Sequence, residues 1–372
     1  MSVVLDERPA TLGFRMPAEW EPHAATWMVW PHNRADWEIK TRAVEWCYVE
    51  IIRHLVPDEH VALICQSEAV RDRAMARLER AGVLRSAYRT YCIKTNRSWI
   101  RDSGPIFLTS TAPSVPSIAV SDWVFNGWAR YRSYDDDHRV PCRIADTLGI
   151  PRFVPNVEQG DRVNNVVLEG GSIDVNGCGD LLATEECLLG ESQARNPNLS
   201  RVELETVLHN TLGARRVHWL VGGIDGDDTH GHIDDVARFV APNRIVAAVE
   251  DCNDDINHDV LQRNLGRLQQ MKNGDGDGFD IIPIAMPKAV FFDGMRLPAS
   301  YLNFYIGNSV VLVPTFNDGR DSEALALFEG LFPTREVVGI YAGDLILGLG
   351  AIHCVTQQQP VGYVSESEDN RD

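Results

Sequence analysis

The sequence predicts an α/β fold, a five-bladed pseudo-symmetric α/β-propeller built from ββαβ units. Two observations support this fold class. One order of elements, a β-hairpin, a helix and a buried strand, recurs along the chain. The turns of three hairpins fall at positions 176, 242 and 307, which are 66 and 65 residues apart. A constant period of this length is typical of a repeat architecture.

The three most regular units occupy the middle and the end of the chain. In the first unit Ser200 and Glu203 form a capping box that begins a helix, and Gly213 ends it. Each hairpin has turn residues such as Asn176-Gly177 between two apolar runs. The predicted hairpin, helix and strand are 166–184, 200–212 and 217–221 in the first unit, 235–249, 256–271 and 279–285 in the second, and 301–313, 321–331 and 337–341 in the third.

The remaining two units are less regular. One has a hairpin over 100–125, around a Pro-rich loop, and a helix over 138–148. The other has strand 24–30, helix 37–55 and strand 60–65, but it lacks a first strand, which we expect residues 351–357 to supply. This pairing would close the ring and remove two exposed sheet edges. The alternative is an irregular α+β domain whose spacing is coincidental.

Composition narrows the class of protein. The 372 residues carry a net charge of −18 and are 44% hydrophobic, which is typical of a globular protein but does not fix the number of domains. Because no linker is visible, we expect one folded domain over 1–364 and a disordered acidic tail over 365–372. The acidity argues against nucleic acid and anionic membranes as partners, and it suits a small cationic ligand. Eight single cysteines, with no secretory signal or membrane-length apolar run, predict a cytoplasmic protein. A homo-oligomer is compatible with the sequence, which does not decide the oligomeric state.

Polar residues stand at the same point of each unit, where the first strand of the hairpin is expected to begin. The spacings between successive units are 67, 65 and 69 residues along the first four. Each residue alone has an ordinary structural explanation, such as a buried core thiol, but together they predict one site on the ring axis. They are Asp102, Glu169, His232 with Asp234, Asn303 and Cys354. Because neighbouring strand residues face opposite sides, Asp235 is expected to point away from that site.

The residue types indicate a chemistry. A cysteine thiolate is a strong nucleophile, and a nearby cation lowers its pKa. The carboxylates around Cys354 cannot provide that cation, so the substrate has to bring it. A guanidinium does so, because its forked N–H groups match carboxylates bidentately. His232 can then protonate the leaving amine and activate water.

Several stretches of the chain resemble the agmatine deiminase and bacterial peptidylarginine deiminase family, within the guanidine-modifying (pentein) superfamily. They are Trp20-Glu-Pro-His, Trp99-Ile-Arg-Asp-Ser-Gly-Pro, Leu168-Glu-Gly-Gly-Ser, Thr184-Glu-Glu-Cys-Leu, Thr229-His-Gly-His-Ile-Asp-Asp, Leu297-Pro-Ala-Ser-Tyr-Leu-Asn-Phe-Tyr and Ile352-His-Cys-Val-Thr-Gln-Gln. The resemblance implies a five-bladed propeller and hydrolysis of a guanidinium without metal or cofactor. It also implies roles: Cys354 as nucleophile, His232 as general acid and base, Asp102 and Asp234 as guanidinium ligands, and Glu169 as support for both. Trp99, Asn303, Trp128 and Asp228 are the expected substrate-binding residues.

The predicted substrate is agmatine, converted to N-carbamoylputrescine, but three stretches depart from the family pattern. They are Asn96-Arg97, Trp128-Ala129-Arg130-Tyr131 and Leu349-Gly350-Ala351, which leave another small guanidino compound or peptidyl-arginine open. An amidinotransferase is an alternative within the superfamily, and a non-catalytic protein that binds cationic ligands is an alternative of another class. A metal hydrolase based on His230, His232 and nearby aspartates, and a calcium loop at 273–278, are disfavoured because their ligand sets are incomplete.

Overall fold

The structure is a computed structural model that describes residues 2–160 and 162–362. The predicted tail at 365–372, and the end of the predicted domain at 364, lie outside these residues. Within them, no helix is both long and apolar enough to cross a membrane.

Five mixed sheets share one strand order. In each sheet the first strand is antiparallel to the second, and the second is parallel to the third. Four sheets have three strands each: β4 (Ile106–Thr109), β5 (Ile118–Ser121) and β6 (Arg152–Phe153); β9 (Asp174–Val175), β10 (Asp180–Thr184) and β11 (Arg216–Leu220); β12 (Ala237–Ala241), β13 (Arg244–Val249) and β14 (Asp280–Ala285); β17 (Tyr305–Ile306), β18 (Val310–Thr315) and β19 (Glu336–Tyr341). The fifth contains β20 (Gln357–Pro360), β1 (His23–Val29), β2 (His60–Cys65) and β3 (Tyr88–Cys92).

A helix connects the second and third strands of every sheet, as the repeat predicted. These helices are α5 (Val140–Leu148), α7 (Arg201–Leu212), α8 (His258–Leu268), α9 (Asp321–Leu331) and α2 (Thr41–Leu55). The capping box that begins α7 is present, and Gly213 ends that helix with a φ of 71°. The predicted helix over 37–55 is divided, because α1 (Arg34–Trp37) and a short 3-10 turn precede α2.

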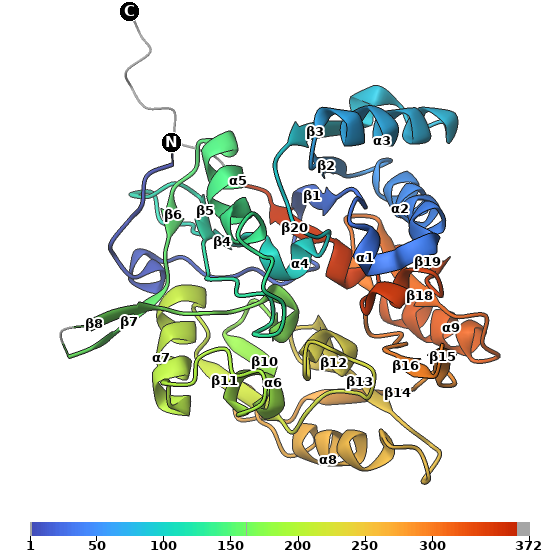
Figure 1. Ribbon diagram of the computed structural model, residues 1–372. Coiled ribbons are helices and arrows are strands. Elements are labelled where there is room, and N and C mark those ends of the chain that lie inside the picture. The colour runs from blue at the N-terminus through green and yellow to red at the C-terminus, as the bar shows by residue number, and fades with distance from the viewer. Residues whose placement is uncertain (1, 161, 363–372) are drawn as a thin grey trace, which may run out of the picture.

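The sheet that joins the two ends of the chain differs from the prediction. Strand β20 does pair with β1, and Figure 1 shows the red C-terminal segment beside the blue β1. The predicted strand over 351–357 is wrong, however, because residues 353–355 form a 3-10 turn and the strand begins only at Gln357. Helix α3 (Glu68–Arg80) and strand β3 were not predicted; only Val70, Ala74 and Leu78 of that charged helix are buried.

The polar residues expected at strand starts lie instead on short helical turns just before the first strands. These turns are α4 (Ile100–Ser103) and the 3-10 turns η5 (Gly170–Ser172), η6 (Ile233–Asp235) and η8 (His353–Val355). Hydroxyl side chains close three of them by donating to carbonyls three or four residues earlier: Ser103 to Trp99 (3.0 Å), Ser172 to Glu169 (2.6 Å) and Thr356 to Ile352 (2.9 Å). Such local bonds compete with extended backbone, which is why the strands begin later.

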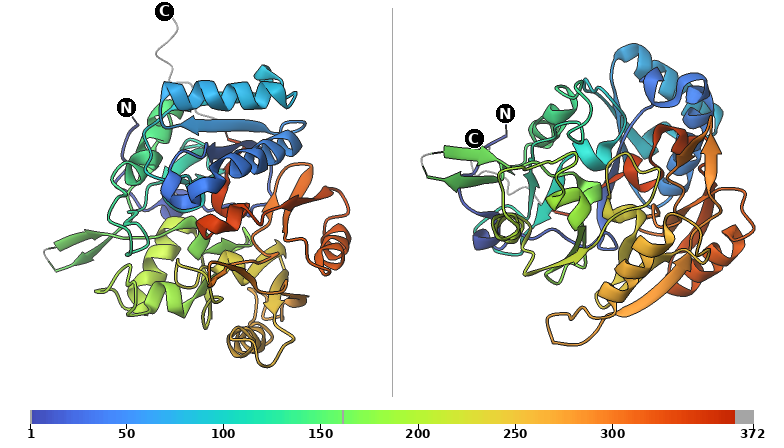
Figure 2. Two further views of the ribbon diagram at one scale, coloured as in Figure 1. Left: turned by 45° about the vertical axis from the view of Figure 1, so that its right-hand side comes forward. Right: turned by 60° about the horizontal axis from the view of Figure 1, so that its bottom comes forward.

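Three smaller elements are added to the repeated units. Helix α6 (Glu185–Leu189) follows β10, and one hairpin consists of β7 (Asn156–Gln159) and β8 (Arg162–Asn165). The hairpin of β7 and β8 extends away from the body of the molecule (Figures 1 and 2). The other hairpin, β15 (Val290–Phe292) and β16 (Met295–Leu297), contributes Phe292 and Met295 to the wall of a pocket described below.

Candidate active site

The helical turns before the first strands contact one another. Turn α4 contacts η5 and η8, and η5 contacts η6. This packing brings together all five residues predicted to be catalytic. The imidazole Nδ1 of His232 lies 3.7 Å from Asp102 Oδ1, and its Nε2 lies 3.6 Å from Glu169 Oε2. The sulfur of Cys354 lies 3.7 Å from Asp234 Oδ2. Each of these side chains is buried.

Gly171 lies where a side chain would not fit. A Cβ atom there would be 2.6 Å from His232 Nδ1, 2.8 Å from Asp102 Oδ1 and 3.1 Å from Asp234 Oδ2. Its backbone N–H donates a hydrogen bond to Asp102 Oδ1 at 3.0 Å. The Gly-Gly stretch therefore leaves room for the convergence of the three side chains and helps to hold one of them.

The site places a thiol among buried acids. Burial raises the pKa of Cys354 well above its usual range, and Asp234, Asp235 and Asp102 raise it further. Burial also opposes protonation of His232, but Asp102 and its other neighbours raise its pKa well above 6.5. Both shifts favour the thiol form of Cys354 and the imidazolium form of His232 in the free protein.

The two aspartates that flank the site have opposite pKa shifts. Burial raises the pKa of Asp102 to about 6, although the charge of His232 opposes this shift. Burial also acts to raise the pKa of Asp234, but the hydrogen bond and the charge of His353 overcome it, so that the net shift is downward. Asp234 is therefore the more strongly ionised of the pair.

The prediction that Asp235 points away from the site is wrong. The side chain is buried, and Asn303 Nδ2 donates to its Oδ1 at 3.1 Å while also lying 3.2 Å from Cys354 Sγ. The alternation expected for a strand does not apply, because Asp235 belongs to the turn η6 and successive residues of a helical turn are not on opposite faces. Burial and Asp234 together raise the pKa of Asp235 well above its ordinary value.

Two buried groups in direct contact with the predicted residues were missed. His353 bridges two acids: its Nδ1 lies 2.7 Å from Asp234 Oδ2, and its Nε2 lies 2.8 Å from Glu19 Oε2. Arg195 is fully buried and forms an ion pair with Glu169 Oε1 at 3.1 Å. His353 could have been found, because it is a polar residue beside Cys354 at the same repeat phase. Arg195 lies in a loop without a pattern, so no such signal existed.

Three of the four predicted substrate-binding residues line a narrow cavity of about 20 Å³, together with Asp102 and Cys354: they are Trp99, Trp128 and Asp228. Trp128 Nε1 donates to Asp102 Oδ2 at 2.9 Å. Asn303 is not in this wall; its carbonyl oxygen accepts from the backbone N–H of His353 at 2.9 Å, and its amide nitrogen faces Cys354 Sγ.

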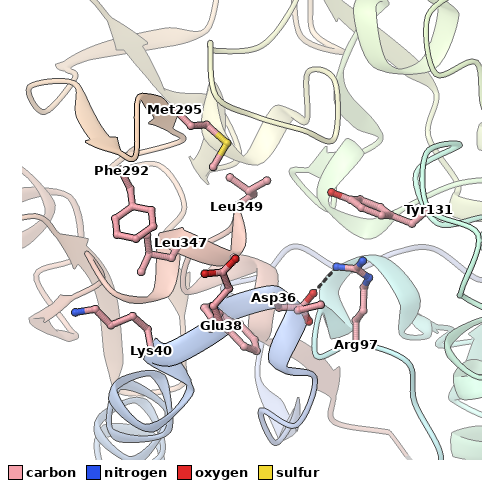
Figure 3. Close-up of a pocket in the computed structure, with 12 residues that line it drawn as sticks. Asp36, Glu38, Lys40, Arg97, Tyr131, Phe292, Met295, Leu347 and Leu349 are labelled. Atoms are coloured by element: carbon pink, nitrogen blue, oxygen red, sulfur yellow. Dashed lines mark hydrogen bonds and ion pairs between the residues drawn. The ribbon is translucent and has the colours of Figure 1, made fainter.

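A second cavity of about 210 Å³ adjoins the first and shares Arg97, Tyr131, Gly348 and Leu349 with it (Figure 3). Arg97 forms an ion pair with Asp36, and its guanidinium carbon lies 4.1 Å from the centre of the Tyr131 ring. Arg97 is therefore already paired, although it stands at a departure from the family pattern. Burial raises the pKa of Asp36 to about 7, against the opposing charge of Arg97.

The acids near His230 do not form the ligand set of a metal hydrolase in the described part of the chain. Asp227 instead accepts hydrogen bonds from the backbone N–H groups of Thr229 (2.8 Å), Gly231 (2.9 Å) and His232 (3.0 Å). It therefore fixes the loop that carries His232. In the loop at 273–278, Asn273 Oδ1 accepts from the backbone of Asp275 and Asp277, as in a surface turn.

Comparison with solved structures places the chain in the mixed α/β fold class of the guanidine-modifying (pentein) enzymes. An agmatine deiminase of Enterococcus faecalis has a TM-score of 0.86 and 30% identity, covering 97% of this chain and 99% of that one. The sequence profile of the Porphyromonas-type peptidyl-arginine deiminases matches residues 15–360, and the chain belongs to this family. Two agmatine deiminases, from Pseudomonas aeruginosa strain UCBPP-PA14 and Ectopseudomonas mendocina, are each 34% identical; the matches cover 95% and 96% of this chain and 97% and 98% of theirs.

Proposed function

We propose that the protein hydrolyses the guanidinium group of agmatine, giving N-carbamoylputrescine and ammonia. One observation carries this proposal: among the described residues, buried polar atoms around Cys354 lack hydrogen-bond partners. They are Glu169 Oε2, both ring nitrogens of His232, and Asp234 Oδ1. Buried polar groups are normally satisfied, so the partner of Asp234 Oδ1 is expected to come from a ligand, whereas Glu169 Oε2 and His232 Nε2 face each other at 3.6 Å. A guanidinium offers N–H donors and a positive charge, which suit these acids. The relatives named agmatine deiminase support the choice of substrate.

In the first half of the proposed reaction, Asp102 and Asp234 hold the guanidinium with its carbon facing Cys354 Sγ. The positive charge of the substrate lowers the pKa of the thiol, so the thiol proton is released to solvent as the substrate binds. The thiolate attacks the carbon, a C–S bond forms, and the C–N bond to one terminal nitrogen breaks. His232, an imidazolium in the free protein, gives its proton to that nitrogen, which leaves as ammonia.

In the second half, His232 is neutral and takes a proton from water. The resulting hydroxide attacks the carbon of the amidino-thioether, the C–S bond breaks, and the ureido product leaves. Glu169 orients His232 through Nε2, and Arg195 orients Glu169 in turn. The side-chain oxygen of Asn303 accepts from the backbone N–H groups of His353 and of the nucleophile Cys354 itself, and so holds the backbone there.

The rest of the substrate is proposed to extend between Trp99 and Trp128 toward Asp228. The hydroxyl of Tyr131 donates to Asp228 Oδ2. The carboxylate of Asp228 lines the inner cavity with Trp99 and Trp128 and is the proposed partner for a distal ammonium. Because Arg97 is already paired with Asp36, it is not proposed to bind a carboxylate of the substrate.

We further propose that the five sheets are blades of a pseudo-symmetric five-bladed α/β-propeller. The shared strand order and the contacts among the turns before the first strands support this arrangement. We also propose a single catalytic domain over 1–364 and a cytoplasmic location. The proposed partner is a small cationic substrate in place of nucleic acid or a membrane. Eight cysteines free of disulfides are compatible with that location.

The test measures ammonia and the ureido product from agmatine, free arginine, an arginyl peptide and 4-guanidinobutyrate. We expect agmatine to have the highest kcat/KM. Cys354→Ser should lower kcat at least about 10³-fold, because a hydroxyl among these acids stays protonated. Cys65→Ser, at a buried thiol of β2, is the control and should retain activity. Substantial turnover by Cys354→Ser would refute the proposed reaction. Stoichiometric transfer of the amidino group to an added amine, with no ureido product, would also refute it.

A further inference from the structure

We propose that Glu169, Cys187 and His232 form a binding site for a thiophilic divalent cation of the Zn²⁺ type, and that an ion bound there inhibits the enzyme. One carboxylate oxygen, the thiol sulfur and one imidazole nitrogen all lie within 4.8 Å of one another. Cys187 belongs to α6, whereas Glu169 and His232 immediately precede η5 and η6. The proposed reaction leaves Cys187 without a role.

The ligand atoms are buried and free to coordinate. Cys187 and Glu169 are completely buried, and His232 is 1% exposed. Arg195 occupies Glu169 Oε1 and thereby leaves Oε2 directed at His232 Nε2, 3.6 Å away. Neither of these two atoms has a hydrogen-bond partner in the described structure. A carboxylate oxygen, an imidazole nitrogen and a thiol therefore face one another across one small volume.

This donor set suits Zn²⁺ and its analogue Co²⁺. Zinc binds sulfur, nitrogen and oxygen at about 2.0–2.3 Å in tetrahedral geometry, so its ligand atoms lie roughly 3.3–3.7 Å apart. Small side-chain rotations would bring the three atoms to such spacings, with water as the fourth ligand. On binding, the Cys187 thiol and the Nε2–H group of His232 each lose a proton to solvent, so that Cys187 coordinates as a thiolate and His232 as a neutral imidazole. The charge of Arg195 opposes the ion, but Asp102, 3.7 Å from His232 Nδ1, offsets it.

An ion at this position would block catalysis without touching Cys354. With the ion on Nε2, the single proton of the neutral imidazole stays on Nδ1. His232 can then neither protonate the departing ammonia nor accept a proton from water. Glu169 Oε2, bound to the ion, would also no longer orient His232. The cavity that reaches Asp102 offers a route of entry. The site therefore predicts reversible inhibition of an enzyme whose reaction itself uses no metal.

The first experiment titrates the full-length protein with Zn²⁺ during agmatine turnover and then adds a chelator. We expect inhibition that the chelator reverses. Cys187→Ser should keep the metal-free kcat and raise the Zn²⁺ concentration for half-inhibition about tenfold or more. Cys92→Ser, at an exposed thiol, should be inhibited like the unmodified protein. Inhibition of Cys187→Ser at unchanged Zn²⁺ concentration would overturn the proposal. Should this variant fail to fold, Cys187→Ala replaces it.

The second experiment needs no turnover, so it separates failure of this site from failure of the proposed function. Co²⁺ is added to Cys354→Ser, and thiolate-to-metal absorption is recorded in the near ultraviolet. We expect the band in Cys354→Ser and its loss in the double variant Cys187→Ser/Cys354→Ser. If Cys354→Ser shows no band, Cys187 does not bind the ion and the nucleophile is the remaining candidate ligand. If the band persists in the double variant, the ion is bound by another cysteine. Either result would overturn the proposal.

Discussion

At the scale of single residues, the two aspartates of the site are equivalent in sequence position but not in environment. Asp234 receives His353 at 2.7 Å, which lowers its pKa. Asp102 accepts from the indole N–H of Trp128 and the backbone N–H of Gly171, and burial raises its pKa to about 6 although the charge of His232, 3.7 Å away, opposes the shift. Asp102 is thus the member of the pair that titrates near neutral pH, whereas Asp234 stays charged.

This difference predicts the acid limb of the activity profile. As the pH falls through about 6, Asp102 gains a proton and loses its charge-assisted contact with the guanidinium. We expect kcat/KM to fall roughly tenfold per pH unit below that point. Asp102→Asn should be slow at every pH and lack this limb, whereas Asp36→Asn, outside the inner cavity, should keep it. A profile of Asp102→Asn with the same limb would assign the titration to another group.

His353 is expected to act on catalysis through Asp234. His353→Gln removes the bridging imidazole, so the pKa of Asp234 should rise and its charged fraction should fall as the pH falls. Activity should therefore drop more at pH 6 than at pH 8, relative to the unmodified protein. The measurement is kcat/KM across this range, with thermal unfolding alongside it. An equal loss at all pH values would indicate that His353 only contributes packing.

At the scale of elements, local signals were predicted well and the starts of the strands were not. The helices over 200–212 and 321–331 agree with α7 and α9, and in α7 the capping box and Gly213 that predicted its ends are present. The turns that carry Asp102, Glu169, Asp234 and Cys354 were predicted as strands. Their apolar neighbours are buried in either conformation, so hydrophobic pattern does not distinguish the two. The structure still brings these predicted residues together, because the repeat fixes position along the chain independently of local conformation.

The cap of α7 gives a test at this scale. Ser200 Oγ accepts from the backbone N–H of Glu203, and Glu203 Oε2 accepts from the backbone N–H of Ser200 at 2.8 Å. Ser200→Ala should lower the free energy of unfolding by about 1 kcal/mol. Thr206→Ala in the exposed middle of the same helix, where the hydroxyl only bonds to Val202 O, should change it by much less. Urea unfolding measures both, and equal effects would argue against the cap.

At the scale of the whole molecule, one buried charge network connects distant parts of the chain through Glu19. Its carboxylate accepts from the backbone N–H of Ile306 at 2.8 Å and pairs with His353 (2.8 Å), Arg238 (3.0 Å) and Arg101 (3.3 Å). These partners belong to four different units of the repeat. The segment before β1 therefore joins the units close to the site, a role that no local sequence signal reveals.

Glu19→Gln should consequently destabilise the entire fold. Removing one charge from a buried network leaves its partners uncompensated, which costs about 3–5 kcal/mol. Glu21→Gln is the matched control, because Glu21 forms a partly exposed ion pair with Arg15 that is worth about 1 kcal/mol or less.

Burial opposes ionisation of Glu19, but Arg238 and His353 hold its pKa well below 4.5. The stabilisation is therefore fully present above pH 4.5 and is lost as the pH falls through the lower pKa of the folded state. Unfolding in urea at pH 7 should separate the two variants clearly, and the difference between Glu19→Gln and the unmodified protein should shrink at strongly acidic pH. If Glu19→Gln costs no more than Glu21→Gln at pH 7, the network does not hold the units together, and the position of His353 beside Asp234 must depend on packing alone.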